Sequence, residues 1–363
     1  MSSHNPEPPD AQATGDSRPK TDDLRLKTAK ALTIVLVLLF QLTIGLVLAE
    51  GVLLATYRYP AAWYPAGFMN FLRTEYFSRR RIIQMDERTA RYDSELFYTL
   101  QPGAFMFSNP EFSTQFVVNR IGVRDNQRSL EQPEIVVAGD SYAMGWGVRQ
   151  DQSFPELIER RAGRRVLNAA VSSYGTVREG RMLERIDLSR TTTLIVQYAP
   201  NDFNENDEFL KRGNQYTPSS REEWLAAIAE QRRRARYWPF RMVYDSVVWI
   251  KRGITGWPQG GFEPTHYPAD AAAERFLNAL MHASRRDLSA LRIIVLDIDE
   301  DPAFIRALDR RHRSETYPAY IRGMRVVDLS GRLTPDLHYV LDDHLNARGH
   351  QAIADALIEV LER

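Results

Sequence analysis

Three side chains of this 363-residue chain have the types that acyl transfer needs. Ser141 follows the apolar run 135–138 and offers a hydroxyl nucleophile, and His344 lies near the C-terminus, two residues after Asp342. An imidazole can take the proton of the hydroxyl, and a carboxylate can hold that imidazole in the required orientation. The three residues therefore predict a Ser-His-Asp arrangement.

Donors for the oxyanion that acyl transfer generates follow neighbouring apolar runs. The backbone N–H of Ser141 falls where a helix should begin, and helix N-termini favour negative charge. Gly175 follows the run 166–168 and offers a bare N–H, and Asn201 follows the run 193–198 and offers a side-chain amide. Together these three donors would stabilise a tetrahedral intermediate.

Four short blocks, taken in order, resemble the SGNH (GDSL-like) hydrolase family. The blocks are Gly139-Asp140-Ser141, Gly175, Asn201-Asp202 and Asp342-x-His344. The resemblance covers residues 134–363 apart from one long insertion. It implies a flavodoxin-like three-layer α/β/α fold and a Ser-His-Asp mechanism. It also implies that the family's four named roles fall to Ser141, Gly175, Asn201 and His344.

Two positions differ from the family's usual pattern. Ala199 stands where the family commonly has a glycine, and Leu341 stands where the commoner catalytic acid lies, three residues before the histidine. Asp342 instead resembles the Asp-x-His variant of proteins that acetylate alginate and related polysaccharides. Asp343 stays open as an alternative acid, although directly adjacent residues seldom point at one another.

The elements that must position these residues alternate between strands and helices. Five apolar runs are expected to be strands: 135–138, 166–168, 193–198, 293–298 and 324–329. Helical patterns fall at 154–161, 179–186, 271–284 and 304–311, and an amphipathic helix with Asn346 as its N-cap ends the chain. This alternation predicts a doubly wound, five-stranded parallel sheet, with sites at the carboxyl ends of its strands. We assign the hydrolase-like domain to residues 131–363.

An apolar segment precedes this domain. Residues 31–49 carry no charge, and at about 1.5 Å per residue they nearly span a hydrocarbon core of about 30 Å. The apolar run resumes after Glu50, so we expect one transmembrane helix over residues 31–56, with the lipid bilayer as its partner. A buried core helix and a cleavable signal peptide are the alternatives.

The flanking charges indicate how this helix is oriented. Residues 1–30 are polar and are expected to form a disordered tail, with five basic residues close to the span: Arg18, Lys20, Arg25, Lys27 and Lys30. On the other side only Arg58 is close, although residues 79–81 add three arginines farther on. The positive-inside rule then places the tail in the cytoplasm and the catalytic domain outside it, in the periplasm or the extracellular space.

Two further segments are assigned by pattern. Residues 57–130 form an approach segment in which 114–118 and 121–123 could pair as a hairpin. The insertion 203–264 holds four of the six tryptophans and a basic run. We interpret it as a lid beside the cleft whose Trp238 and Trp249 bind substrate, by stacking on sugars or by meeting the bilayer interface. A helical hairpin with its own small core is the alternative.

Other chemistries have little support in the sequence. Lys and Arg together equal Asp and Glu at 47 each, which argues against a nucleic-acid partner, and cysteine is absent. The glycines after residue 138 fit neither nucleotide-binding motif. His338, His344 and His350 are spaced six residues apart, which does not place metal ligands on one helical face. We expect no metal or cofactor, and interpret His338 as a loop residue and His350 as a helix-surface residue.

Three functions fit these observations. The first is an esterase that removes acyl groups from a cell-surface glycan or lipid. The second is an O-acetyltransferase that acts on an exopolysaccharide and differs only in the group that accepts the acyl chain. The third is a membrane-tethered binding module that keeps the fold without the chemistry.

Overall fold

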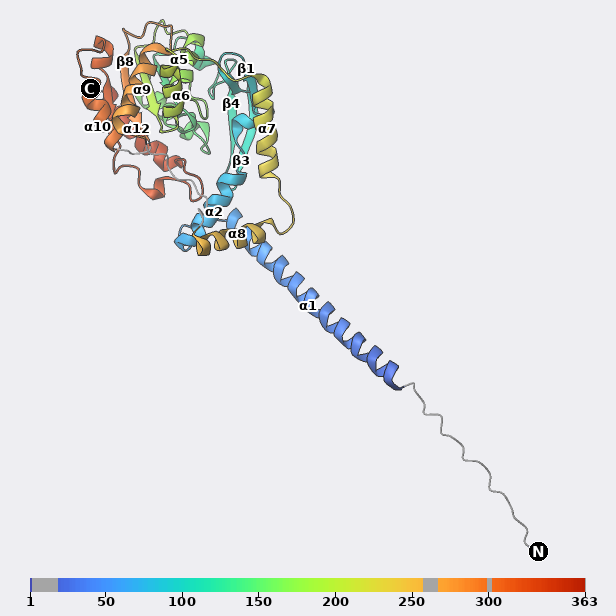
Figure 1. The fold of residues 1–363 in the computed structure, drawn as a ribbon. Coiled ribbons are helices and arrows are strands. Elements are labelled where there is room, and N and C mark those ends of the chain that lie inside the picture. The colour runs from blue at the N-terminus through green and yellow to red at the C-terminus, as the bar shows by residue number, and fades with distance from the viewer. Residues whose placement is uncertain (2–18, 257–266, 299–301, 363) are drawn as a thin grey trace.

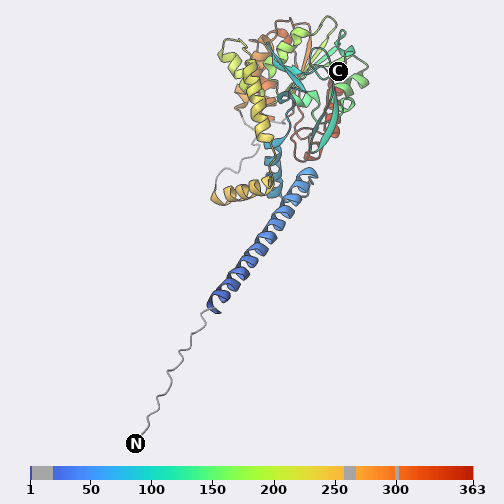
Figure 2. The ribbon, with the colours of Figure 1, turned by 90° about the vertical axis from the view of Figure 1, so that its right-hand side faces the viewer.

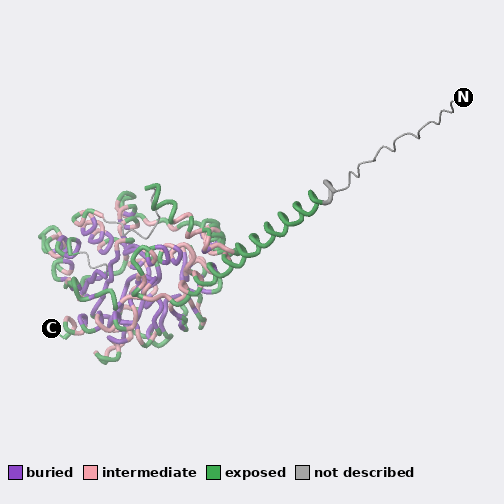
Figure 3. Tube along the Cα trace, turned by 90° about the horizontal axis from the view of Figure 1, so that it is seen from below, coloured by how far each residue is buried: buried purple, intermediate pink, exposed green. Residues whose placement is uncertain are grey.

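A long N-terminal helix leads into an α/β body in the computed structural model, which describes residues 1, 19–256, 267–298 and 302–362 (Figures 1 and 2). The helix, α1 (Pro19–Arg58), projects from the body, and its apolar side chains between Leu24 and Val52 are largely exposed (Figure 3). Among the described helices it is the one long and apolar enough to cross a membrane. An apolar surface of this kind is stable in lipid and not in water.

The start of α1 corrects one boundary. Residues 19–30 were expected to belong to a disordered tail, but they are helical. Their composition explains this, because Lys27 pairs with Asp23 one turn away at 2.7 Å, and a proline is tolerated in the first turn of a helix. Residues 2–18 of the expected tail lie outside the described residues.

A five-stranded parallel sheet forms the centre of the body. Its strands are β5 (Ile135–Ala138), β6 (Val166–Asn168), β7 (Thr193–Tyr198), β8 (Arg292–Asp297) and β9 (Arg325–Val327). They lie in the order β6-β5-β7-β8-β9, all parallel. This is the flavodoxin-like order, in which the first strand lies between the second and the third. The expected fold class is therefore confirmed, with the first three strands at the predicted residues.

Helices cover both faces of the sheet. On one face α9 (Ala269–His282) packs against α5 (Thr176–Met182), α6 (Asp202–Lys211) and α10 (Pro302–Arg311). On the other, α12 (Ala347–Leu361) packs against α4 (Phe154–Ala162). Asn346 caps α12 as predicted, since its side chain accepts hydrogen bonds from two N–H groups of the first turn. Short helices complete the body: α3 (Ser141–Met144), α11 (Ala319–Arg322), η2 (Arg128–Leu130), η3 (Gln150–Gln152), η4 (Leu183–Arg185) and η5 (Pro335–Leu337).

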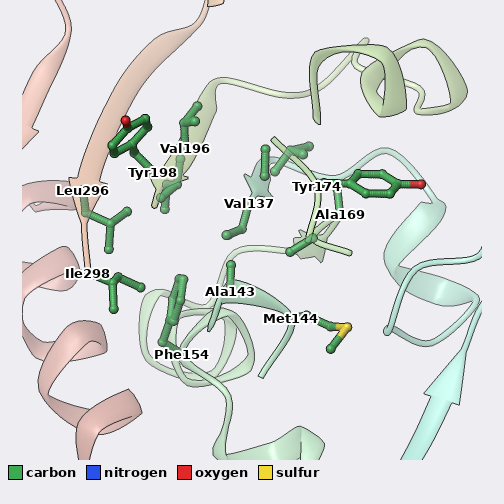
Figure 4. Close-up of a cluster of buried hydrophobic side chains, with 14 of the residues drawn as sticks. Val137, Ala143, Met144, Phe154, Ala169, Tyr174, Val196, Tyr198, Leu296 and Ile298 are labelled. Carbon is green, nitrogen blue, oxygen red and sulfur yellow. The ribbon is translucent and has the colours of Figure 1, made fainter. Parts of the chain in front are cut away.

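The core lies between these layers. All four residues of β5 and all six of β7 are buried, as expected for strands covered on both faces. Figure 4 shows Val137, Val196 and Leu296, from three neighbouring strands, together with Phe154 of α4. This rigid centre fixes the strand ends from which the polar site residues emerge.

The approach segment contains a helix and two hairpins. The helix is α2 (Ala66–Arg79), followed by η1 (Ile83–Met85), and the hairpins pair β1 (Ala90–Asp93) with β2 (Phe97–Leu100) and β3 (Gly103–Asn109) with β4 (Phe112–Val118). The expected hairpin of 114–118 with 121–123 is wrong. Residues 114–118 pair with β3 instead, because Asn119 and Gly122 close a tight turn in which Gly122 has a φ of 86°.

The insertion lies against the approach segment and α1. Its helix α7 (Arg221–Ala235) packs on α2, η1 and β1, and α8 (Arg241–Thr255) packs on α1 (Figures 1 and 2). Trp224 of α7 is buried and donates its ring N–H to the carbonyl of Gln84. Residues 257–264 of the insertion lie outside the described residues.

Candidate active site

Ser141 is held at the start of α3 by a tightly packed turn. The preceding Gly139 has no room for a side chain, because a Cβ there would lie 2.6 Å from Oε1 of Gln197. That same oxygen accepts hydrogen bonds from the N–H groups of Asp140 and Ala143. The Asp140 side chain caps α3 by accepting from Tyr142 N–H at 3.0 Å. The nucleophile candidate therefore lies at a helix N-terminus, where N–H groups have no partner inside the helix.

The structure brings together the three residues of the expected triad. Nε2 of His344 lies 2.7 Å from Oγ of Ser141, and Nδ1 lies 2.5 Å from Oδ1 of Asp342. The three residues are buried, with exposed fractions of 2–7%. This is the arrangement in which an imidazole can move a proton to and from a serine hydroxyl.

Aromatic rings fix the plane of the imidazole. The ring of Tyr142 contacts the ring of His344, with 4.6 Å between their centroids. The ring of Trp146 is stacked on that of His344, with 5.0 Å between centroids and 20° between the ring planes. Both rings come from α3 or the residues just after it, so the turn that carries Ser141 also orients His344. A ring held in this way keeps Nε2 aimed at the nucleophile.

Asp342 is surrounded by hydrogen-bond donors. Its Oδ2 accepts from the Tyr76 hydroxyl and from the ring N–H of Trp146, the latter at 2.9 Å. Its Oδ1 lies 3.6 Å from the guanidinium of Arg80. Tyr76 and Arg80 come from α2 and its C-terminal end. Neither residue was predicted, because no motif marks a residue that reaches a site across more than 260 positions.

The two aspartates beside His344 are not equivalent. Asp343 also approaches, with Oδ1 3.1 Å from Nδ1, so the expectation that an adjacent residue points elsewhere is wrong. However, the side chain of Asp343 is 24% exposed and forms an ion pair with Arg80 at 3.2 Å, whereas that of Asp342 is fully buried. The shorter contact and the greater burial belong to Asp342.

These charges shift the pKa values of the pair in opposite directions. Burial alone would lower the pKa of His344, but the carboxylates of Asp342 and Asp343 outweigh it and raise the pKa to about 9. Burial alone would raise the pKa of Asp342, but the positive charges of His344 and Arg80 hold it below its ordinary value. The two shifts have one origin, because the negative charge of Asp342 and the positive charge of a protonated His344 stabilise each other.

Glu111 holds the loop that carries the acid. It lies in the turn between β3 and β4, and its carboxylate accepts the backbone N–H groups of Val340, Leu341 and Asp342 at 2.6–2.8 Å. Three such bonds fix the backbone of the acid itself. This role was not predicted, because the hairpin was expected farther along the chain.

The expected oxyanion donors Gly175 and Asn201 lie in the segments that follow the two strands adjacent to β5, seven residues after the end of β6 and three after the end of β7. Gly175 begins α5 and packs so closely on α6 that a Cβ would lie 3.0 Å from the carboxyl carbon of Glu205. Glu205 in turn accepts from the backbone N–H and the guanidinium of Arg178, which fixes this turn. Asn201 begins α6, is exposed, and makes no side-chain bond to that helix. Its amide is therefore free to turn towards a ligand.

The two tryptophans expected to bind substrate lie elsewhere. The Trp249 ring contacts Phe71 of α2 at 6.0 Å, and the Trp238 ring contacts Tyr244 at 5.5 Å. Among the described residues, the rings that contact His344 are Tyr142 and Trp146. The structure does not bring Trp238 or Trp249 together with the triad, and their part in substrate binding stays a prediction.

A metal ion would fit this site poorly. Asp342, Asp343 and His344 do place ligand atoms within 4.8 Å of one another. However, the guanidinium of Arg80 lies beside both carboxylates and would repel a cation.

His350 was expected on the surface of the last helix, and this expectation is wrong. The ring is 1% exposed, and its Nδ1 accepts the N–H of Phe154. Burial lowers the pKa of His350 to about 3.

The chain matches no protein-family model and no curated protein. Among solved structures it is similar to TesA, at 13% identity and a TM-score of 0.33, over 62% of this chain and 97% of that one. It is also similar to phospholipase A1 from Streptomyces albidoflavus NA297, at 12% identity and a TM-score of 0.33, over 63% and 99%. An extracellular lipase from Streptomyces rimosus is similar at 16% identity and a TM-score of 0.31, over 62% and 98%. At these identities the likeness concerns the fold alone.

Proposed function

We propose that this chain is a membrane-anchored serine esterase that forms an acyl-enzyme on Ser141. The observation that carries the proposal is the unbroken series of contacts from Ser141 Oγ through both ring nitrogens of His344 to Asp342, at 2.7 and 2.5 Å. A serine used only as a turn residue would not need a buried imidazole oriented by a buried carboxylate. The roles of nucleophile, base and acid are assigned to these three residues.

Acylation begins from the neutral imidazole, with its Nδ1–H donating to Asp342. Ser141 Oγ bonds to the carbonyl carbon of the ester, its proton passes to Nε2 of His344, and the carbonyl π electrons move onto oxygen. The tetrahedral intermediate then collapses. The bond to the alcohol oxygen breaks, and that oxygen takes the proton from Nε2, which leaves an acyl group on Ser141.

Deacylation repeats these steps with an acceptor in place of the serine. A water molecule gives its proton to Nε2 of His344 as its oxygen bonds to the acyl carbon. The bond to Ser141 Oγ then breaks, and Oγ recovers the proton. In both steps the N–H groups of Ser141 and Gly175 and the side-chain amide of Asn201 are assigned as the donors to the negatively charged oxygen.

The substrate class follows from the anchor. We place α1 across a bilayer, with the N-terminus in the cytoplasm and the catalytic domain in the periplasm or the extracellular space. The support is the charge-free run 31–49 and the basic residues that precede it. An esterase tethered in this way meets acyl esters of cell-surface glycans or lipids.

Covalent labelling tests the nucleophile. The full-length protein in detergent or nanodiscs should react with a fluorophosphonate probe, and Ser141→Ala should not. Ser189→Ala, an exposed serine outside the site, is the matched control and should label like the native chain. Equal labelling of Ser141→Ala and the native chain would remove the esterase proposal and favour a binding module that lacks the chemistry.

The Asp-x-His spacing keeps one second candidate, an O-acetyltransferase that modifies an exopolysaccharide. The acyl-enzyme is the same, and a sugar hydroxyl replaces water in the second step. Turnover of p-nitrophenyl acetate with and without added oligosaccharide separates the two. Acetylated oligosaccharide detected by mass spectrometry would favour transfer, and release of acetate at an unchanged rate would favour hydrolysis.

A further inference from the structure

Among the described residues, nothing packs over an apolar row on the outer face of α8. Val243, Val247, Ile250 and Ile254 follow one another at intervals of four, three and four residues, which places them on one side of an α-helix. The last three have exposed fractions of 59%, 54% and 80%. Apolar side chains this exposed, in a continuous row, mark a surface that is covered by something.

Another side of α8 is packed, so the helix is held in place. Met242 is fully buried in a cluster with Leu72 and Tyr76 of α2, and the Trp249 ring lies against the first turn of α2 at Gly67. The exposed row is thus a second apolar face of a fixed helix. The row is therefore not a core-facing surface that became exposed because α8 detached from the body.

Glu50 of α1 fixes the start of α8 to the membrane helix. Its carboxylate accepts the backbone N–H groups of Met242 and Val243 at 3.2 and 2.9 Å, and the hydroxyl of Tyr237 at 2.8 Å. Glu50 is also the residue that ends the charge-free run 31–49. Because that run extends for about 28 Å at about 1.5 Å per residue, α8 begins at the level where a bilayer core of about 30 Å ends.

The direction and surroundings of α8 fit a position at the edge of the bilayer core. The helix runs across the body-side end of α1 rather than along it (Figures 1 and 2). Aromatic side chains suited to the headgroup region lie nearby, since Trp238 is 42% exposed and contacts Tyr244 at the start of α8. Lys251, which is exposed, flanks the apolar row, and its ammonium group can reach lipid phosphates.

We propose that α8 is an interfacial helix whose row Val243, Val247, Ile250 and Ile254 inserts into the outer leaflet of the bilayer that α1 crosses. The occupant of the apolar row is lipid, because α8 begins at Glu50, beside the exposed apolar side chains of α1 such as Leu48 and Val52. The inference rests on the proposed transmembrane placement of α1. It deepens that proposal, since α8 packs on α2 and α2 contacts Asp342 through Tyr76. The active site would therefore be held at a fixed height above the membrane.

Spin labels on single cysteines test this, because the native chain has none. Val247→Cys, Ile254→Cys and the matched control Arg252→Cys, on the other side of α8, are labelled with a nitroxide. The full-length variants are placed in nanodiscs of phosphatidylethanolamine and phosphatidylglycerol. Collision of the label with oxygen, relative to collision with a water-soluble nickel chelate, should be several-fold higher at positions 247 and 254 than at 252. Reaction of each variant with the fluorophosphonate probe shows that it is folded.

Equal nickel accessibility at 247 and 252 would overturn the proposal. Spin–spin broadening at 247 that disappears on dilution with unlabelled protein would overturn it in favour of a second copy of the chain. A label at Ile44→Cys, within α1, separates the failure of this inference from the failure of its basis. Water access at 44 removes the transmembrane placement itself, whereas lipid access at 44 with water access at 247 removes only the role of α8.

Discussion

Tyr76 donates its hydroxyl group to Oδ2 of Asp342 across 266 residues of chain. The donor lies on α2, the first helix after α1, and the acceptor is the proposed triad acid. Burial raises the pKa of Tyr76, and the negative charge of Asp342 adds to this, so the phenol stays protonated and remains a donor. The approach segment is thus part of the candidate active site, since Arg80 contacts Asp342 as well.

Replacing Tyr76 by phenylalanine should lower kcat with little change in KM. The change removes one of the two donors to Oδ2, and a hydrogen bond to a charged group contributes about 1.5–3 kcal/mol. If the whole effect is felt in the transition state, kcat falls about 10- to 150-fold, at about 1.4 kcal/mol for each tenfold. Steady-state turnover of a p-nitrophenyl ester measures this.

Tyr92→Phe is the matched control for this change. Its hydroxyl donates to the carbonyl of Ser219 on the far side of the approach segment, at 3.2 Å. Its kcat should stay near the native value. If Tyr76→Phe turns over like Tyr92→Phe, the contact with Asp342 is structural and does not position the triad.

The choice of acid leads to a second prediction. Asp342→Asn should lower kcat by about three to four orders of magnitude, because an amide at Oδ1 would favour the wrong tautomer of His344. Asp343→Asn should lower the plateau rate only a few-fold, since its carboxylate lies farther from Nδ1 and is partly exposed. The opposite ranking in steady-state rates would make Asp343 the acid.

The activity should rise with pH well above the ordinary range of histidine. Only neutral His344 can take the proton of Ser141, and its pKa is raised to about 9 by Asp342 and Asp343 against the effect of burial. kcat/KM should therefore increase roughly tenfold per pH unit below about 9 and level off above it. Stopped assays between pH 6 and 10 measure this profile in the free enzyme.

Asp343→Asn should move that profile to lower pH, because one of the negative charges that stabilise the imidazolium is removed. Asp336→Asn, an exposed change in the same C-terminal region, should leave the midpoint where it is. A native midpoint at the ordinary value of about 6.5 would show that the charged pair does not control His344 in solution.

Local sequence patterns predicted much of this fold, but they did not predict contacts between residues that are far apart in the chain. The run 193–198 is β7 to the residue, because a strand buried on both faces is a continuous apolar stretch. Asn346 was predicted as a cap from its position alone, since capping depends on neighbours three residues away. Tyr76 and Glu111 were missed because their partners lie more than 200 positions away.

The meeting of Ser141, His344 and Asp342 could be expected for a related reason. Ser141, His344 and Asp342 have types that suggest chemistry, and strand ends in a parallel sheet converge on one edge. The error at His350 shows the limit of this reasoning. A polar residue on an amphipathic helix is normally exposed, but here the ring is buried against Phe154, where it satisfies the first N–H of α4.

The oxyanion assignment leads to the last prediction, which separates catalysis from stability. Asn201→Ala should lower kcat about 100- to 1000-fold, the usual loss when one oxyanion donor is removed. The side chain is exposed and makes no bond to α6, so the melting temperature should stay unchanged. Asn204→Ala, one turn farther along the same helix and also exposed, is the matched control and should keep both native values. A loss of stability in Asn201→Ala without a loss of kcat in the folded fraction would make Asn201 a residue of the turn rather than of the oxyanion hole.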